Sequence, residues 1–217
     1  MPYGEKTPEQ LFEYADKILK FFKEKNAKAV VMACNTTSSV IYDRIKDKYG
    51  IKIYPVVQSV SKILSEMPVK KIGVFATNVT VKSDAYKKEI QKNNPNIEVI
   101  QNSCPEWVKI VEDNEIAENT DKIKLKLDEM LKYKPDKIVL GCTHYPYLLD
   151  TLSKYAKRDL FIDPAIYFAQ YIKEDMKASG LLSDGNGIEE IYVSSNPEQF
   201  RISAKMFYEL KDLPKVL

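Results

Sequence analysis

Two cysteines occupy matching places in this sequence. Cys34 follows the apolar run 29–33, and Cys142 follows the apolar run 138–141, and both runs are typical of buried strands. Helix-starting residues come next in each case, so each cysteine is predicted at a strand-to-helix turn. Two such thiols could act as acid and base on opposite faces of one carbon. That is the chemistry of racemisation, in which one face loses a proton while the other gains one.

A helix N-terminus suits a thiol with both roles. Its unpaired N–H groups and partial positive charge can lower the pKa of a cysteine from about 8.5 toward about 7, so that thiol and thiolate coexist at neutral pH. The same N–H groups can hold an anionic ligand. Because no motif typical of PLP enzymes is present, the protein's own side chains would do the chemistry.

Three further residues each have both a structural and a chemical interpretation. A lone cysteine is more often a small apolar core residue, and Cys104 is assigned that role because it lacks a strand-end position beside a capping run. His144, the only histidine, is either a surface residue or a group that orients Cys142 or carries its proton. Glu112, at the end of an apolar run, is either a solvated carboxylate or the partner of His144.

The cysteines must be positioned by alternating strands and helices. Strands are predicted at 28–33, 51–56, 71–76, 97–101, 138–141, 160–162 and 190–193, and helices at 8–25, 35–48, 59–66, 81–93, 104–112, 120–133, 146–156, 164–178 and 197–210. This order predicts an α/β fold with parallel sheets, in which ligands bind at the carboxyl ends of strands. We expect two similar, doubly wound, flavodoxin-like lobes facing a central cleft. Residues 1–66 with 163–217 form the first, incomplete lobe, and 67–162 form the second.

The bulk composition excludes several function classes. The 217 residues carry 33 basic and 31 acidic side chains, so the net charge of +2 gives no reason to expect nucleic acid or a membrane as partner. No apolar run approaches the length of a membrane span, and residues 1–6 lack a signal-peptide core, which predicts a cytoplasmic protein. Three cysteines without a CxxC motif argue against disulfides and against a standard zinc site.

The two cysteine segments carry a resemblance to a known family. Residues 33–36 (Ala-Cys-Asn-Thr) and 141–146 (Gly-Cys-Thr-His-Tyr-Pro) resemble the cysteine signatures of the cofactor-independent glutamate racemases, within the Asp/Glu racemase family. Further segments resemble the substrate loop and the intervening motifs of that family in the same order: 2–4, 6–9, 76–86 and 104–112.

The resemblance implies interconversion of L- and D-glutamate without PLP, metal or other cofactor, supplying D-glutamate for peptidoglycan. By the family pattern Cys34 works on the D-enantiomer face and Cys142 on the L face, assisted by His144 and Glu112. The substrate-binding residues implied are Pro2, Tyr3, Gly4, Asn35, Thr36, Thr77, Thr80 and Thr143. The Pro-Tyr-Gly segment favours glutamate over aspartate or hydantoins, and the resemblance also implies a homodimer.

One departure from the family keeps other functions open. The family normally opens with a strand ending in Asp-Ser-Gly-x-Gly-Gly, then a helix and a second strand, whereas this chain starts at the Pro-Tyr-Gly loop. The absent Asp would assist the first cysteine, and the absent strands would leave 28–33 with an unpaired edge. One alternative is therefore a non-catalytic homologue that binds acidic amino acids or a protein partner. The other is a related racemase acting on aspartate.

Overall fold

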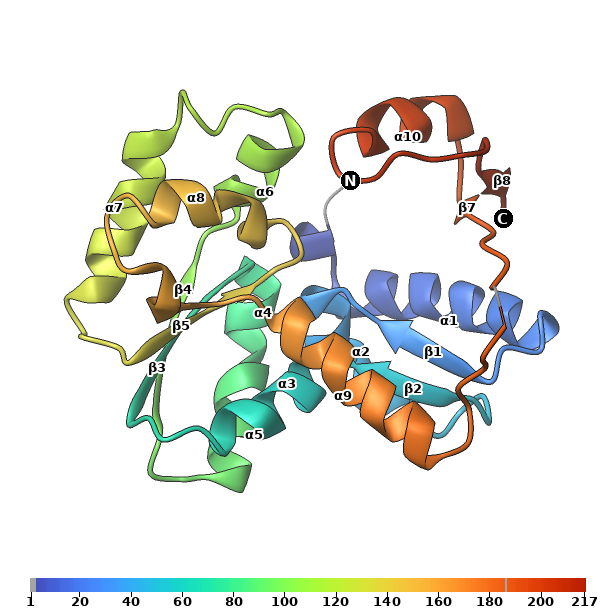
Figure 1. Cartoon of the computed structure of the whole chain (residues 1–217), viewed down its shortest axis with the longest axis horizontal. Helices are drawn as coiled ribbons and strands as arrows, with labels where there is room; N and C mark the ends of the chain where they lie inside the picture. Colours follow the sequence, from blue (N-terminus) through green and yellow to red (C-terminus); the bar gives the residue numbers. More distant parts are fainter. Residues whose placement is uncertain (1–2, 186) are drawn as a thin grey trace. The chain divides into compact units, whose positions relative to one another are not determined.

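The sheets of this protein are built from parallel strand pairs. The structure, a computed structural model, describes residues 3–185 and 187–217, and every strand pair in that part is parallel. The larger sheet has the strand order β4-β3-β5-β6 (Glu98–Ser103, Lys71–Ala76, Lys137–Gly141 and Phe161–Ile162), and a smaller one pairs β1 with β2 (Ala29–Met32 and Lys52–Pro55) (Figure 1). The predicted α/β class with parallel sheets is confirmed.

Helices connect the strands of both sheets. Those before residue 181 are α1 (Pro8–Glu24), α2 (Asn35–Ile45), α3 (Val56–Ser65), α4 (Asn78–Ser83), α5 (Ala85–Asn93), α6 (Glu106–Glu112), α7 (Thr120–Leu131), α8 (Leu149–Leu152) and α9 (Pro164–Ala178), with short 3-10 turns η1 (Tyr3–Glu5), η2 (Tyr145–Leu148) and η3 (Arg158–Leu160). None of the helices in the described ranges is long and apolar enough to cross a membrane.

Successive residues of the central strand β3 pack into two cores, one on each face of the larger sheet. Ile72 and Val74 join a core with residues of α3 and α5 on one face. On the other face the Phe75 ring contacts Trp107 of α6, with 4.8 Å between ring centroids, and Gly73 lies against Met130 of α7. Because successive side chains of a strand point to opposite faces, this apolar run requires helices on both sides.

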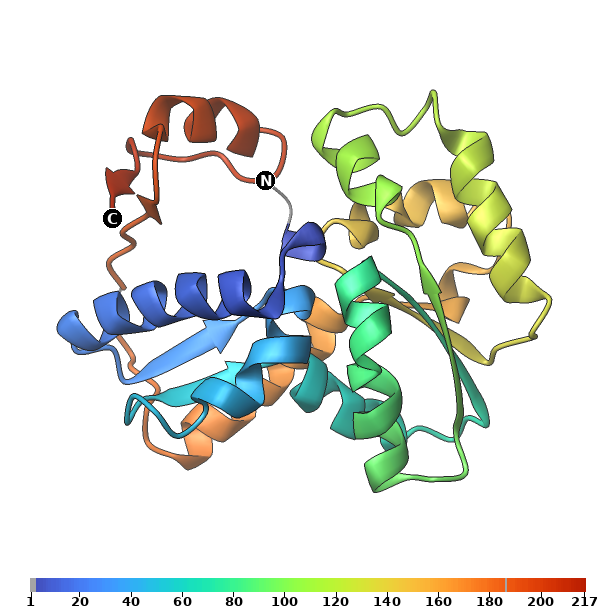
Figure 2. The ribbon, with the colours of Figure 1, turned by 180° about the vertical axis from the view of Figure 1, so that it is seen from behind.

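The smaller sheet is also covered from two sides. Leu11 of α1 and Ile41 of α2 pack with Val30 of β1 in a second core, and Figure 2 shows α1 running along β1. On the other side the Tyr54 ring of β2 meets Tyr171 of α9, with centroids 6.3 Å apart. Within the described residues β1 pairs with β2 alone, as predicted, and Val31 is half exposed.

The start of α1 follows the sequence prediction closely. The Gln10 backbone N–H donates to Thr7 Oγ1 at 3.2 Å, and the Thr7 N–H donates to Gln10 Oε1 at 3.1 Å. This reciprocal capping box and Pro8 at the first helical position define the helix start from local sequence alone.

Two helix predictions are wrong. The helix predicted at 81–93 is divided into α4 and α5 at Asp84, which adopts a left-handed φ of 56° that aspartate tolerates better than most residues. The helix predicted at 146–156 is a 3-10 turn followed by the single turn α8. There the Tyr145 hydroxyl donates to the Cys104 carbonyl oxygen at 2.7 Å, a tertiary contact that anchors the tight first turn.

The chain divides into two compact units after Gly180. The second unit contains β7 (Tyr192–Val193), α10 (Pro197–Ala204) and β8 (Lys215–Val216), and β7 pairs in parallel with β8. Asn196 caps α10 as predicted by accepting the Gln199 N–H at 3.2 Å, but the helix ends at Ala204 instead of 210 and β8 was not expected. The lobe boundaries 1–66 with 163–217 and 67–162 stay a prediction.

Candidate functional site

Cys34 lies at the N-terminus of α2, where its carbonyl oxygen accepts the Ser38 N–H at 2.9 Å. Extended backbone at Cys34 (φ −73°, ψ 116°) brings β1 directly into the helix. The next two side chains, Asn35 and Thr36, are buried. Because the first N–H groups of a helix have no partner within it, this turn offers donors to an anionic group beside the thiol.

Cys142 directly follows β5 and sits in a tight turn. Its N–H donates to the Leu140 carbonyl oxygen at 2.9 Å, and its own carbonyl oxygen accepts the Tyr145 N–H at 3.1 Å. The side chain is buried, with 8% of the residue exposed. Both predicted cysteines therefore occupy strand-to-helix turns, although η2 replaces the expected α-helix after Cys142.

The electrostatics of Cys142 differ from the sequence prediction. Burial raises the pKa of the Cys142 thiol to about 11 from its ordinary value of 9.0, while the His144 backbone N–H acts in the opposite direction. The expected lowering toward 7 is wrong for this residue, because desolvation of the thiolate outweighs the donors around it. The Cys34 thiol also raises the pKa of Cys142, so the two thiols lie within electrostatic range of each other.

His144 and Glu112 extend from Cys142 as a chain of polar contacts. The distance from Cys142 Sγ to His144 Nδ1 is 3.8 Å, and the His144 Nε2–H donates to Glu112 Oε1 over 3.1 Å. Glu112 is the last residue of α6, and the histidine stands two positions after the cysteine in the turn that follows β5. The structure thus brings together three residues that were predicted to act together. Two of them, Glu112 and Cys142, are 30 positions apart in the sequence.

Three threonine hydroxyls form a buried cluster near Cys34. The Thr36 and Thr77 Oγ1 atoms are 2.9 Å apart, those of Thr77 and Thr80 are 3.1 Å apart, and Thr80 is 3.5 Å from Thr36. They come from the first turns of α2 and α4, on different strand–helix units. Hydroxyls that are both donors and acceptors can rearrange to receive a carboxylate or an ammonium group.

The segment before α1 approaches the same place. A Cβ added to Gly4 would lie 2.9 Å from Thr77 Cβ, so only glycine permits this approach. Burial raises the pKa of the Tyr3 hydroxyl, and the nearby Cys34 thiol adds to the rise. Tyr3 and Gly4 therefore lie beside the first cysteine and the threonine cluster, and the predicted Pro2 lies outside the described residues.

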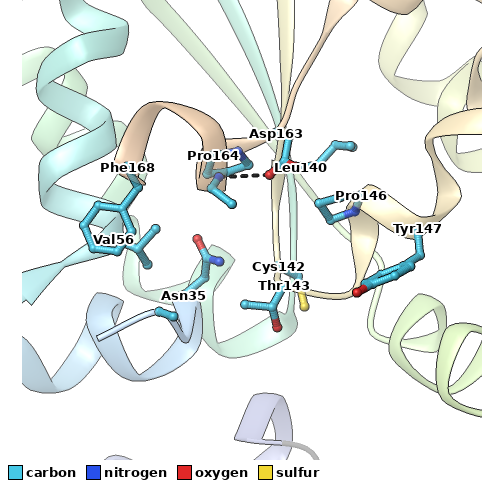
Figure 3. A pocket seen from close by; sticks show the side chains of 12 residues that line it. Asn35, Val56, Leu140, Cys142, Thr143, Pro146, Tyr147, Asp163, Pro164 and Phe168 are labelled. Atoms are coloured by element: carbon cyan, nitrogen blue, oxygen red, sulfur yellow. Dashed lines mark hydrogen bonds between the residues drawn. The ribbon is translucent and has the colours of Figure 1, made fainter. Parts of the chain in front are cut away.

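A cavity of about 430 Å³ lies between the starts of α2, α3 and α9 and the turn that follows β5 (Figure 3). Of the predicted site residues, Asn35, Cys142 and Thr143 line it, and Figure 3 shows Asn35 across from Cys142 and Thr143. Several apolar or aromatic residues complete the wall, among them Val56, Leu140, Pro146, Tyr147 and Phe168. The wall therefore includes surface beyond the predicted contacts.

Asp163 also lines the cavity, and sequence reasoning missed it. It follows β6 and caps α9, since its Oδ1 accepts the Ala165 N–H at 2.9 Å. The signal was available: an Asp-Pro pair after a predicted parallel strand marks a helix start at the same sheet edge as Cys142.

The third cysteine, Cys104, is not part of this arrangement. Cys104 is fully buried, and burial raises the pKa of its thiol far above its usual range, as expected of a core residue. Within 3–185 and 187–217, no three histidine, cysteine or acidic side chains are grouped so as to hold a metal ion.

Comparisons with known proteins give one consistent result. The sequence profile of the Asp/Glu/hydantoin racemases matches residues 2–172. The chain is 32% identical over 221 aligned positions to a glutamate racemase of Carboxydothermus hydrogenoformans, and the match covers 100% of the chain and 82% of that protein. It is 38% identical to glutamate racemase 2 of Caldanaerobacter subterraneus subsp. tengcongensis, over 95% of the chain and 79% of that protein.

The fold is similar to that of solved racemases. A crystal structure of glutamate racemase from Francisella tularensis in complex with D-glutamate superimposes with a TM-score of 0.87 at 29% identity, covering 100% of this chain and 84% of the other. The predicted α/β fold with two lobes and parallel sheets therefore matches that of a solved glutamate racemase.

Proposed function

The chain belongs to the Asp/Glu/hydantoin racemase family, and from this premise we propose that it interconverts L- and D-glutamate with two cysteine thiols as acid and base. The observation that carries the proposal is the placement of the two thiols. Each follows a parallel strand at a strand-to-helix turn, and Asn35, the neighbour of Cys34, lies across the cavity from Cys142. Because the similar proteins reported above are glutamate racemases, we infer glutamate as the substrate in preference to aspartate. We assign the product D-glutamate to peptidoglycan synthesis on the family resemblance. The homodimer and the cytoplasmic location stay predictions.

The proposed reaction moves one proton off and one proton onto the α-carbon. From L-glutamate, the Cys142 thiolate removes the α-proton, and the bonding electrons delocalise into the α-carboxylate. The Cys34 thiol then donates its proton to the opposite face, which gives D-glutamate. Cys142 ends as a thiol and Cys34 as a thiolate, and this is the protonation state that D-glutamate needs for the reverse direction.

His144 and Glu112 have a defined task in this scheme. Cys142 must lose its proton before it can act on L-glutamate, and its pKa of about 11 makes that loss unfavourable at neutral pH. His144 Nδ1 lies 3.8 Å from the sulfur and can accept the proton, while the Glu112 carboxylate 3.1 Å from Nε2 stabilises the imidazolium that results.

The substrate's charged groups are assigned to the polar residues around the thiols. The N–H groups at the start of α2, together with Asn35 and the threonine cluster, are suited to carboxylates. Thr143 lines the cavity next to Cys142, and Asp163 gives the same wall a carboxylate that complements an ammonium group. The backbone of Tyr3 and Gly4 completes the binding site proposed here.

Loss of optical activity tests the proposed racemisation. Purified protein is incubated without added cofactor with L-glutamate and, separately, with D-glutamate, and circular dichroism is followed over time. We expect the signal to decay to zero from both enantiomers, since the equilibrium mixture is racemic, and aspartate to react far more slowly. Retained optical activity with a folded chain would contradict the proposal and leave binding of an acidic amino acid as the function. Faster decay with aspartate would reassign the substrate.

Gly4 tests the proposed substrate loop. Gly4→Ala forces the loop away from Thr77, because the new Cβ would meet Thr77 Cβ at 2.9 Å. We expect the KM for glutamate to rise about fivefold, equivalent to roughly 1 kcal/mol. Gly187→Ala is the matched control, since nothing lies within 4 Å of a Cβ added there. Equal KM values for the two variants would remove Gly4 from the site.

A further inference from the structure

A buried tyrosine outside the predicted site is bonded to the residue that follows Cys34. Tyr86 of α5 has no exposed surface, and its hydroxyl donates to Asn35 Oδ1 at 2.7 Å. Asn35 is the first residue of α2 and lines the cavity. The bond crosses between two strand–helix units, from α5 beside the larger sheet to the helix that begins at the smaller sheet.

The ring of the same tyrosine touches the residue that precedes Cys142. A Cβ added to Gly141 would lie 3.1 Å from Tyr86 Cε2 and 2.9 Å from the Phe75 carbonyl oxygen. Gly141 is therefore closed in by the ring on one side and by β3 on the other. One side chain thus contacts the neighbours of both cysteines.

The hydroxyl is a fixed donor. Burial, and to a smaller extent the Cys142 thiol, raise the pKa of Tyr86 far above its usual range, so the proton stays on the oxygen. Asn35 Oδ1 accepts the hydrogen bond from this hydroxyl, and this holds the Asn35 amide in one orientation. The Asn35 Nδ2 group keeps its two N–H donors for other partners. Asn35 stands in the cavity wall across from Cys142 and Thr143 (Figure 3).

We propose that Tyr86 is a positioning residue, which orients the Asn35 amide toward a substrate carboxylate and holds the backbone beside Cys34 and Cys142 at a fixed separation. This inference rests on the proposed racemisation of glutamate. Asn35 would touch the substrate, whereas Tyr86 acts only through Asn35 and Gly141.

Tyr86→Phe removes the hydroxyl and keeps the ring against Gly141. We expect the KM for both enantiomers of glutamate to rise about tenfold, with kcat within about threefold of wild type, because one oriented hydrogen bond to the substrate is lost while the thiols keep their places. Steady-state kinetics by circular dichroism measure both constants.

Tyr54→Phe is the matched control. Its hydroxyl is also that of a buried tyrosine and donates to Asp175 Oδ2 at 2.6 Å, but it lies in β2 and contacts no proposed site residue through that bond. We expect an unchanged KM for Tyr54→Phe, although it loses a hydrogen bond of similar length. Equal KM values for the two variants would mean that loss of a buried hydroxyl has a general structural effect, and would overturn the inference.

A double-mutant cycle separates positioning from folding. If Tyr86 acts through Asn35, Tyr86→Phe raises KM in the wild-type background but adds nothing to Asn35→Ala. An undiminished effect in the Asn35→Ala background would overturn the inference, as would an unaltered KM for Tyr86→Phe in an active enzyme. These two results would leave the proposed racemase activity intact. A wild-type chain that does not racemise glutamate would instead reject the proposed function and the inference together.

Discussion

Replacing either Cys34 or Cys142 with alanine is expected to reduce racemisation of glutamate by about 10³-fold or more in both directions, the range of a positioned proton-transfer group. Each thiol serves one face of the α-carbon, so the loss of one blocks the net reaction from both enantiomers. The equilibrium constant of a racemisation is 1, which means that kcat/KM must fall equally for L- and D-glutamate. Circular dichroism with each enantiomer measures the decline.

The third cysteine supplies the control for this experiment. Cys104 is fully buried and removed from the proposed reaction, so Cys104→Ala should keep near-wild-type kcat/KM even where it lowers the melting temperature. Activity retained in Cys34→Ala or in Cys142→Ala would reject the two-thiol mechanism. Activity lost in all three variants would point to a folding defect, which near-ultraviolet circular dichroism would reveal.

Alkylation of Cys142 by iodoacetamide should be strongly suppressed at neutral pH and should rise with a midpoint near pH 11. Burial favours the neutral thiol, so the raised pKa means that the thiolate appears only as the pH increases beyond the ordinary value of 9.0. At pH 8 about one Cys142 thiol in a thousand would be ionised, against about one in ten for a cysteine with the reference pKa of 9.0. The expected difference in rate is therefore about 10²-fold.

The measurement needs a chain in which only this thiol reacts. A variant with Cys34→Ala and Cys104→Ala leaves Cys142 alone, and mass spectrometry follows its labelling from pH 7 to 11.5. The same variant unfolded in guanidinium chloride is the control, with a midpoint expected near 9. A folded-state midpoint at or below 9 would show that the His144 N–H and the surrounding dipoles outweigh burial.

A pKa this high has a consequence for the proposed mechanism. The resting Cys142 is a thiol, so it can donate a proton to the carbanion formed from D-glutamate without preparation. In the opposite direction it must first be deprotonated, and the ammonium group of bound L-glutamate together with His144 would favour the thiolate. Substrate binding itself would thus complete the base.

Local sequence determined most of the elements and predicted the strand-end places of the two thiols. The capping box at Thr7 defined the start of α1, and the apolar run 71–76 defined β3 to the residue, because caps and alternation depend on neighbours within a few positions. Asn35 and the strand before it marked Cys34 as a strand-end residue for the same reason. The pairing of Cys34 and Cys142 was predicted from their matching places at the carboxyl ends of parallel strands, where ligands bind in α/β folds. The two strands belong to different sheets, so the sequence did not determine the distance between the thiols.

Only the tertiary structure decided how these residues act on one another. The raised pKa of Cys142 comes from burial, whereas its local sequence predicted a lowered one. The hydroxyl contact between Thr36 and Thr77 and the bond from Tyr86 to Asn35 join residues 41 and 51 positions apart. A pattern of a few residues encodes hydrogen bonds within a turn or a helix. Distances between units, and the solvent that packing excludes, depend on the whole core and cannot be read from either segment alone.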